Sequence, residues 1–127
     1  MRLLLDTHVF IWSFSNPKRL KVDVARELKS SLNDLFVSVA SIWEIQIKLK
    51  LGKMKLDASL QTIVYEQENN GIQILNIDQR HALFIENLPL YHKDPFDRML
   101  ISQAMVEDMT IVTVDKRFSD YDVKVLW

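Results

Sequence analysis

The chain has 127 residues, of which 48% are hydrophobic and 26% are charged, and its formal net charge is −1. This length suits one domain with a buried core, and the composition excludes a disordered chain. With no cysteine and no apolar stretch long enough to span a bilayer, disulfides, thiolate metal sites and a membrane span are excluded, and we expect a single domain over residues 1–127 in the cytoplasm.

The first half of the chain predicts strands that are each followed by helical segments. Short apolar runs indicate the strands, and apolar residues at helical spacing indicate the helices. The pair Asn16-Pro17 ends the first helix, because the residue before a proline disfavours helical backbone. In chain order we expect a strand over Leu3–Leu5, helices over Val9–Phe14 and Val22–Leu32, a strand over Leu35–Val39 and a helix from Ser41 to Gly52.

The second half repeats this alternation. Asp78 can cap a helix, and Asp94-Pro95 is typical of a helix start, because aspartate caps well and proline suits the first helical position. A helix over Leu60–Gln67, a strand over Ile72–Leu75, a helix after Asp78, a helix after Asp94-Pro95, a strand over Thr110–Val114 and a strand over Val123–Leu126 are expected in this order. Such alternation predicts an α/β fold with a parallel sheet covered on both faces.

Acidic residues stand where strands of this sheet should end. Asp6 and Asp115 directly follow predicted strands, and Glu44 and Asp97 lie in the first turns of predicted helices. Ligands of open parallel sheets bind beyond the carboxyl ends of the strands. Carboxylates gathered there repel one another unless a cation lies among them, so the sequence suggests a metal site.

Each acid also has a structural interpretation. Asp6 and Asp94 suit helix caps. Ser41 and Glu44 have the spacing of a capping box, and Lys48 is placed to pair with Glu44 along the helix. For Asp115, the neighbouring Lys116 or Arg117 could neutralise the carboxylate.

Asp97 is harder to explain as a structural residue. Its helical neighbours Leu100, Ile101 and Ala104 are apolar, so its carboxylate emerges from an apolar face. A carboxylate on the buried side of a helix requires a partner. This position therefore favours a functional role.

Five segments of the chain carry a family resemblance. They are Leu3–His8 (LLLDTH), Ser41–Ile45 (SIWEI) with the following Lys48–Lys55, His92–Ile101 (HKDPFDRMLI) before Gln103-Ala104, Val112–Asp115 (VTVD) with Arg117-Phe118, and the terminal Val125–Trp127 (VLW). Together they span nearly the whole chain, and in this order they resemble the PIN-domain ribonucleases, and among these the VapC-type toxins of prokaryotic toxin–antitoxin pairs.

The resemblance implies a three-layer α/β/α domain with a short, mainly parallel sheet. It also implies an active site in which an acidic quartet holds Mg²⁺, with Mn²⁺ as a substitute. The quartet matches Asp6, Glu44, Asp97 and Asp115. Asp94 and Asp97 are one helical turn apart and either could occupy the third position; we favour Asp97 as the ligand and Asp94 as a cap beside the site. Thr7 and Thr113 would orient ligands through hydrogen bonds, and Arg98 would balance the pocket or contact phosphate.

The chemistry expected of such a site is hydrolysis of RNA. Oxygen ligands without a cluster of histidine or cysteine select Mg²⁺ or Mn²⁺, and water activated at such a site can cleave a phosphodiester in line. The resemblance implies a toxin endoribonuclease that forms a homodimer and is blocked by a cognate antitoxin. The alternatives are a PIN-like scaffold that binds RNA or protein without cleavage, and a phosphatase of the haloacid dehalogenase class, which His8 disfavours because that class has an aspartate there.

Charge is divided unevenly between the two parts of the chain. Residues 1–56 carry ten Lys and Arg against five Asp and Glu, whereas residues 57–127 carry six against twelve. The basic part includes Lys48, Lys50, Lys53 and Lys55, with no acid among them. These lysines either line a path for the RNA backbone or form an ordinary solvated helix end.

Overall fold

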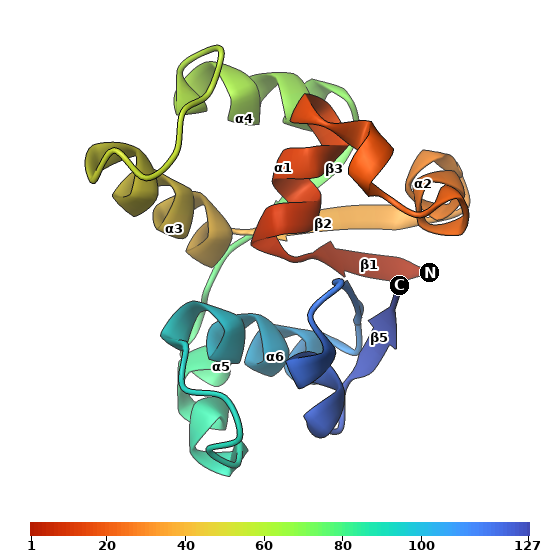
Figure 1. Ribbon diagram of the computed structural model, residues 1–127. Helices are drawn as coiled ribbons and strands as arrows, with labels where there is room; N and C mark the ends of the chain where they lie inside the picture. Colours follow the sequence, from red (N-terminus) through yellow and green to blue (C-terminus); the bar gives the residue numbers. More distant parts are fainter.

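A five-stranded sheet lies between two layers of helices in the computed structural model, which describes residues 1–127 (Figure 1). Its strands are ordered β3-β2-β1-β4-β5, and every neighbouring pair is parallel. The strands are β1 Arg2–Leu5, β2 Asp34–Ser38, β3 Ile72–Leu75, β4 Thr110–Val112 and β5 Lys124–Leu126. The predicted α/β class and parallel sheet are therefore confirmed.

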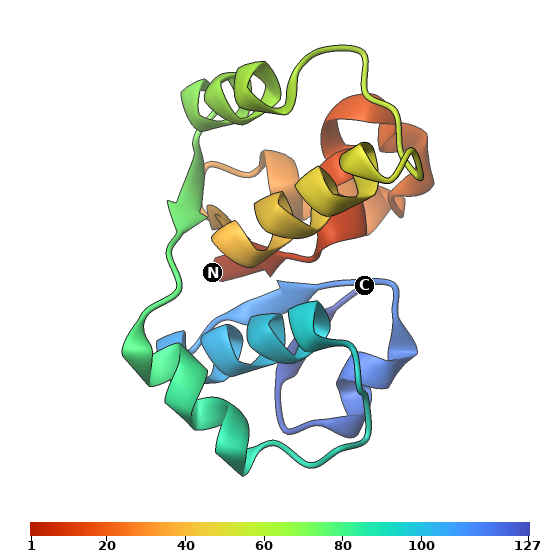
Figure 2. The same cartoon turned by 90° about the vertical axis from the view of Figure 1, so that its left-hand side faces the viewer.

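The helices cover the two faces of the sheet unequally. The first four lie on one face and the last two on the other, as the two perpendicular views show (Figures 1 and 2). The α-helices are α1 Thr7–Ser15, α2 Val22–Lys29, α3 Val39–Lys50, α4 Leu60–Asn69, α5 Gln79–Phe84 and α6 Pro95–Glu107, and the 3-10 helices are η1 Pro17–Arg19, η2 Ile85–Asn87 and η3 Lys116–Asp120. None of these helices combines the length and apolar character that a membrane span requires.

The central strand β1 supplies both hydrophobic cores. Because side chains alternate along a strand, Leu3 and Leu5 point to one face and Leu4 to the other, and all three are fully buried. Leu3 and Leu5 join a core with Phe10 of α1, which we call the upper core. Leu4 joins a second core with Ile101 of α6, which we call the lower core.

The strand order creates a switch point beside β1. The chain moves from β1 outward through β2 and β3, then returns to place β4 on the other side of β1. The segments that leave β1 and β4 therefore diverge from adjacent strand ends, where Asp6 N–H donates to Val112 O at 3.0 Å. In parallel sheets such a divergence forms the ligand-binding crevice.

The start of α3 differs from the prediction. We expected the helix to open at Ser41 with a capping box to Glu44, but Ser38 is the N-cap and its Oγ accepts from Ala40 N–H at 3.0 Å. Strand β2 thus ends one residue early, because Val39 is already helical. As a result Glu44 lies in the second turn rather than the first, and the capping box is wrong.

Other helices and strands also end earlier in the sequence than expected. Helix α2 ends at Lys29 instead of Leu32, α3 ends at Lys50, and the helix after Asp78 becomes 3-10 from Ile85 onward. Strand β4 ends at Val112, so Asp115 does not follow the strand directly. Asp115 instead caps η3, and its Oδ1 accepts from Arg117 N–H at 3.0 Å.

Candidate active site

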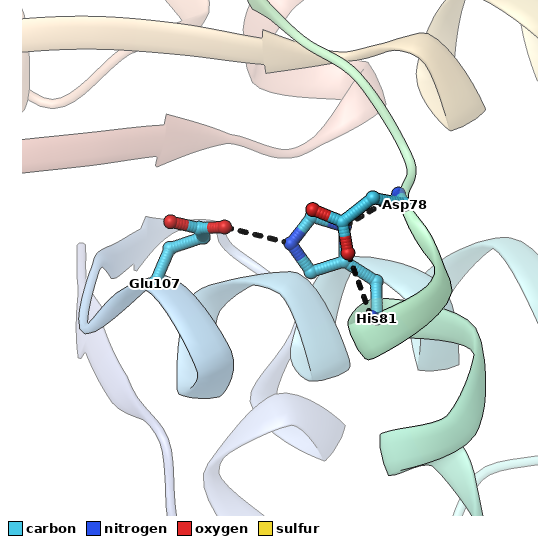
Figure 3. Close-up of side chains that lie close together, drawn as sticks. All are labelled: Asp78, His81 and Glu107. Carbon is cyan, nitrogen blue, oxygen red and sulfur yellow. Dashed lines mark hydrogen bonds and ion pairs between the residues drawn. The ribbon is translucent and has the colours of Figure 1, made fainter.

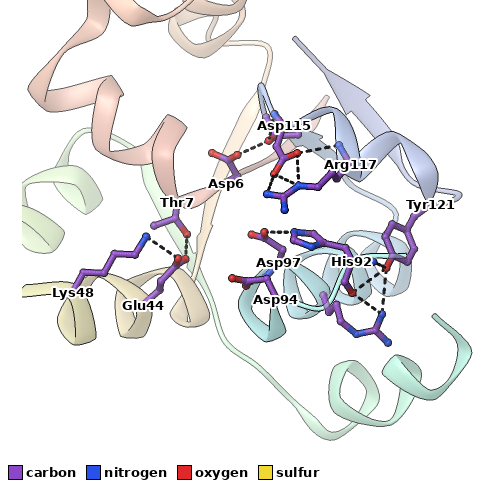
Figure 4. A network of polar contacts seen from close by, with 12 residues as sticks. Asp6, Thr7, Glu44, Lys48, His92, Asp94, Asp97, Asp115, Arg117 and Tyr121 are labelled. Atoms are coloured by element: carbon purple, nitrogen blue, oxygen red, sulfur yellow. Dashed lines mark hydrogen bonds and ion pairs between the residues drawn. The ribbon is translucent and has the colours of Figure 1, made fainter. Parts of the chain in front are cut away.

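Asp6 and Thr113 lie together at the switch point, beside the space between the acidic side chains, which we call the acid pocket (Figure 4). Asp6 is 5% exposed and caps α1, with its Oδ1 accepting from Val9 N–H at 2.7 Å. Its Oδ2 accepts from the buried Thr113 hydroxyl, and the Thr113 Oγ1 in turn accepts from Asp115 N–H at 3.0 Å. One hydroxyl therefore links the acid after β1 to the backbone of the acid after β4.

Glu44 reaches the same pocket from α3. Its Oε1 accepts from the Thr7 hydroxyl at 2.8 Å, and Thr7 Oγ1 also lies 2.9 Å from Ser41 Oγ. Its Oε2 pairs with Lys48 Nζ at 3.1 Å, which confirms the predicted helical ion pair. Ser41 is thus not the helix cap but part of the hydrogen-bonded support of Glu44 and Thr7.

Asp97 and Asp94 enter from the first turn of α6. Because α6 returns toward the start of β4, its N-terminus lies at the carboxyl edge of the sheet (Figure 4). Asp94 is the N-cap, as predicted, with its Oδ1 accepting from Asp97 N–H at 3.0 Å. Asp97 Oδ2 lies 2.6 Å from His92 Nε2, and the other oxygen turns away from the ring.

His92 was not assigned a role from the sequence. It is 6% exposed, and its backbone N–H donates to Tyr121 Oη at 2.8 Å. One ligand atom from each of His92, Asp97 and Asp115 lies within 4.8 Å of the other two. The only sequence signal for His92 is that it stands five residues before Asp97. That spacing does not identify a site residue, because the loop between the two residues determines where the ring points.

Arg98 does not contact the acids although it follows Asp97. Arg98 is 8% exposed, and its guanidinium donates to the carbonyls of Pro89 at 2.7 Å and Leu88 at 3.2 Å. It also donates to Tyr121 Oη at 3.2 Å. These bonds hold the loop before α6, so the expectation that Arg98 balances the pocket or contacts phosphate is not supported by its position.

Asp115 is the acid with the strongest cationic partner. Arg117 contacts both of its carboxylate oxygens, and the closest pair is Nη2–Oδ2 at 2.7 Å. The hydrogen bonds and charge of Arg117 lower the pKa of Asp115. This neutralisation by Arg117 is one of the two that the sequence allowed.

Asp6 and Asp97 have no lysine or arginine partner. Asp6 forms no ion pair, and Asp97 pairs only with His92. Burial raises the pKa of Asp6, and the charge of Asp115 adds to this effect. Burial also raises the pKa of Asp97 to about 6, opposed in part by the hydrogen bond to His92. The site therefore contains one buried and one half-buried acid that no lysine or arginine pairs with directly.

A second cluster of titratable residues lies on the lower face, between α5 and α6 (Figure 3). His81 is 1% exposed, and its Nδ1 accepts from Asp78 N–H at 3.0 Å while Nε2 lies 2.9 Å from Glu107 Oε1. Arg80 pairs with both Asp78 and Glu107, at 2.8 and 2.6 Å. Both ring nitrogens and both acids are thus satisfied, and the cluster fastens one helix to the other.

A comparison with protein families finds one whose domain matches this chain. The PIN domain family matches residues 3–124, which include every acid of the pocket. The chain belongs to the PIN domain family. The predicted family resemblance is therefore confirmed at the level of the domain.

Solved structures share the PIN fold of this chain at low sequence identity. VapBC2 from Rickettsia felis, bound to a DNA fragment from its promoter, has a TM-score of 0.75 at 17% identity, covering 99% of this chain and 98% of that one. FitAcB from Neisseria gonorrhoeae has a TM-score of 0.69 at 21% identity, covering 98% of this chain and 96% of that one. A toxin–antitoxin complex from Klebsiella pneumoniae has a TM-score of 0.65 at 19% identity, covering 98% of this chain and 96% of that one. A comparison with curated sequences finds no significant match.

The acids of this PIN domain fit a hard divalent cation. Their donor atoms are carboxylate oxygens from four different segments, which turn toward one space in Figure 4. Mg²⁺ and Mn²⁺ prefer such ligands and are usually held by a few carboxylates together with water. A cation there would neutralise the charges of Asp6 and Asp97, which no lysine or arginine pairs with directly.

Proposed function

We propose that this PIN domain is a metal-dependent endoribonuclease that acts as the toxin of a toxin–antitoxin pair. The observation that carries the proposal is that Asp6, which is buried, and Asp97, which is half-buried, lie without lysine or arginine ion pairs at the carboxyl edge of a PIN sheet. Asp6, Glu44, Asp97 and Asp115 would hold Mg²⁺ or Mn²⁺, with Asp94 as the helix cap beside them. When bound, the cation makes water more acidic and offsets charge on the phosphate oxygens.

The protein's own side chains hold these ligands in place. Thr113 fixes the orientation of Asp6, Thr7 fixes that of Glu44, and His92 fixes that of Asp97. Such outer hydrogen bonds keep carboxylates ionised and directed before substrate arrives. The hydroxyls of Thr7 and Thr113 both donate to acids, so neither threonine is free to act as a covalent nucleophile.

The reaction we propose is direct hydrolysis of a phosphodiester. Water attacks phosphorus opposite the leaving 3′ oxygen, the P–O3′ bond breaks, and the products carry a 5′-phosphate and a 3′-hydroxyl. Exposed Lys50, Lys53 and Lys55 on the end of α3 and the following loop would attract the phosphate backbone. A product with a 2′,3′-cyclic phosphate would contradict this reaction.

The partners we propose follow from the structures that share the fold. Similar chains occur in solved toxin–antitoxin assemblies, so we propose a small antitoxin protein as the inhibitor of this chain, which would itself be a homodimer in the cytoplasm. A gene for a short protein adjacent to the gene of this chain, whose product co-purifies with it and suppresses RNA cleavage, would support this role.

The test of the activity is RNA cleavage with and without EDTA. The wild-type protein should cleave single-stranded RNA in Mg²⁺ or Mn²⁺, and EDTA should abolish cleavage until the metal is restored. The variant Asp6→Asn keeps an oxygen for the Val9 N–H cap but loses the charge, and should be inactive while remaining folded. RNA binding without any cleavage in either metal would favour the scaffold alternative instead.

A further inference from the structure

Arg117 occupies the carboxylate of an acid that the proposed function needs. Its Nε lies 3.1 and 3.2 Å from the two oxygens of Asp115, and its Nη2 lies 2.7 Å from Oδ2. This two-pronged contact is the strongest geometry available to an arginine and a carboxylate. Asp115 therefore already has a full counter-ion before any ligand enters the pocket.

This contact competes with a cation in the same pocket. Asp115 lies in the cluster with His92 and Asp97 whose ligand atoms fall within 4.8 Å of one another. Oxygens that accept from the guanidinium cannot direct the same lone pairs at a cation, and two positive charges on one carboxylate repel each other. Arg117 and a cation therefore compete for Asp115, and release of Arg117 would make the acid a stronger ligand.

The side chain of Arg117 is free to make this move. It is 61% exposed, and its guanidinium forms hydrogen bonds and an ion pair with Asp115 alone. The backbone below it is held in place, because the next residue, Phe118, is buried in the lower core and Arg117 N–H donates to Asp115. The guanidinium can therefore swing while η3 stays fixed.

The released guanidinium would remain beside the acids at which we propose that the substrate phosphate binds. Figure 4 shows Arg117 next to Asp115 on the side that faces Asp97, and its charge interacts with those of Asp97 and Asp94 as well. Its planar fork fits two phosphate oxygens as well as it fits two carboxylate oxygens. Lys48, by contrast, is held in the same pocket by Glu44.

We propose that Arg117 is an exchangeable counter-ion, which neutralises Asp115 in the cation-free protein and moves to a phosphate of the substrate strand once Asp115 binds a divalent cation. The inference rests on the proposed function, since it takes the acids as cation ligands. It adds a residue that binds substrate, and it explains how the charge of Asp115 would be offset before a cation binds.

The experiment compares Mn²⁺ affinity by calorimetry in the wild type, Arg117→Ala and Arg117→Lys. Removing the competing guanidinium should tighten Mn²⁺ binding roughly fivefold in Arg117→Ala, the order expected for an exposed ion pair. Arg80→Ala is the matched control. Arg80 makes the same contact with an acid two residues before it, Asp78, at 2.8 Å, is also 61% exposed, and lies outside the acid pocket. Its removal should leave Mn²⁺ affinity unchanged.

A second measurement follows binding of a short fluorescent single-stranded DNA oligonucleotide of mixed sequence, which has the same phosphate backbone but is not the RNA that we propose is cleaved. With Mn²⁺ present, Arg117→Ala should bind it about tenfold more weakly than the wild type, because a charge-assisted contact to phosphate is lost. Arg117→Lys should recover part of this affinity, since lysine keeps the charge but not the fork. The two measurements thus move in opposite directions in Arg117→Ala.

The outcomes separate this inference from the proposed function. Equal Mn²⁺ affinity in the wild type and Arg117→Ala, or unchanged oligonucleotide binding, overturns the exchange while leaving the metal site intact. Mn²⁺ binding by none of the proteins overturns the metal site and the exchange together. If Arg117 only held η3 in place, Arg117→Ala would have a lower melting temperature than the wild type and would bind Mn²⁺ more weakly, which is the opposite of the expected tightening.

Discussion

Asp97 connects burial to the pH dependence of metal binding. Burial raises its pKa to about 6, and only the ionised carboxylate binds a cation. We therefore expect Mn²⁺ affinity to be constant above pH 7 and to fall by up to about tenfold per pH unit below the pKa of Asp97. The measurement is a calorimetric titration with Mn²⁺ at several values from about pH 5 to about pH 8, a range that includes the pKa of Asp97. An affinity that stays constant down to pH 5 would contradict this role of Asp97.

Asp94 provides a control for the same effect. Its charge contributes to raising the pKa of Asp97, while its Oδ1 caps α6. The variant Asp94→Asn keeps an oxygen for the cap and removes the charge. The fall in Mn²⁺ affinity should then move to lower pH, with the helix intact by circular dichroism.

Thr113 is expected to act through the acids it joins. Its hydroxyl donates to Asp6 and accepts from Asp115 N–H. Thr113→Val keeps the shape but leaves one Asp6 oxygen and a backbone N–H unsatisfied, so Mn²⁺ affinity should fall about tenfold, the lower end for a group that orients a ligand. Thr113→Ser should restore the affinity. If valine and serine variants bind Mn²⁺ equally well, the hydroxyl does not orient the ligands.

At the level of elements, the start of α3 shows why local sequence was insufficient. Ser38 and Ser41 are both good caps, and Glu44 stands three residues after the second of them. The choice depends on where β2 stops pairing, and that is set by the register of Ser38 opposite Leu75 of β3. Sequence patterns predicted the strand and the helix but could not locate the boundary between them.

The contact between α5 and α6 should contribute stability and not activity. Glu107 binds the buried His81 ring and Arg80, and the hydrogen bond to His81 lowers the pKa of Glu107. Because this pKa is depressed on folding, the contribution is present above the ordinary glutamate range and is lost as pH falls through the folded-state pKa. Glu107→Ala should lower the free energy of unfolding at neutral pH by about 1–3 kcal/mol, since the buried ring N–H loses its partner.

This prediction is checked by urea denaturation with Arg26→Ala as the control. Arg26 pairs with Asp23 at 3.1 Å, but both side chains are largely exposed, so its loss should cost less than about 1 kcal/mol. Mn²⁺ affinity should be unchanged in both variants. A marked loss of Mn²⁺ binding in Glu107→Ala would mean that this cluster influences the acid pocket.

At the scale of the whole molecule, the sequence could nominate candidate acids but not the contacts around them. Asp6 and Asp115 were nominated because strand ends of a parallel sheet share one edge, Asp97 because its helical neighbours are apolar, and Glu44 mainly from the family resemblance. Their support could not, since the positions of His92 and Arg98 depend on the loop before α6, whose path is set by contacts with Tyr121 far along the chain. Patterns of hydrophobicity specify elements, whereas such contacts between distant segments arise only in the folded structure.

The last prediction concerns whether the two cores unfold together, as a single domain requires. Leu4 and Leu5 are fully buried neighbours on β1 that face the lower and the upper core. Either one changed to Ala should cost about 2–5 kcal/mol, because each leaves a cavity. Trp12 and Trp127 pack on the upper core, so fluorescence in a Trp43→Phe background reports that side alone. If the chain unfolds as one unit, Leu4→Ala should shift the fluorescence midpoint in urea as far as the circular dichroism midpoint. A fluorescence midpoint that stays at the wild-type value while circular dichroism shifts would show that the upper layer folds independently, since the lower core would then be lost without disturbing it.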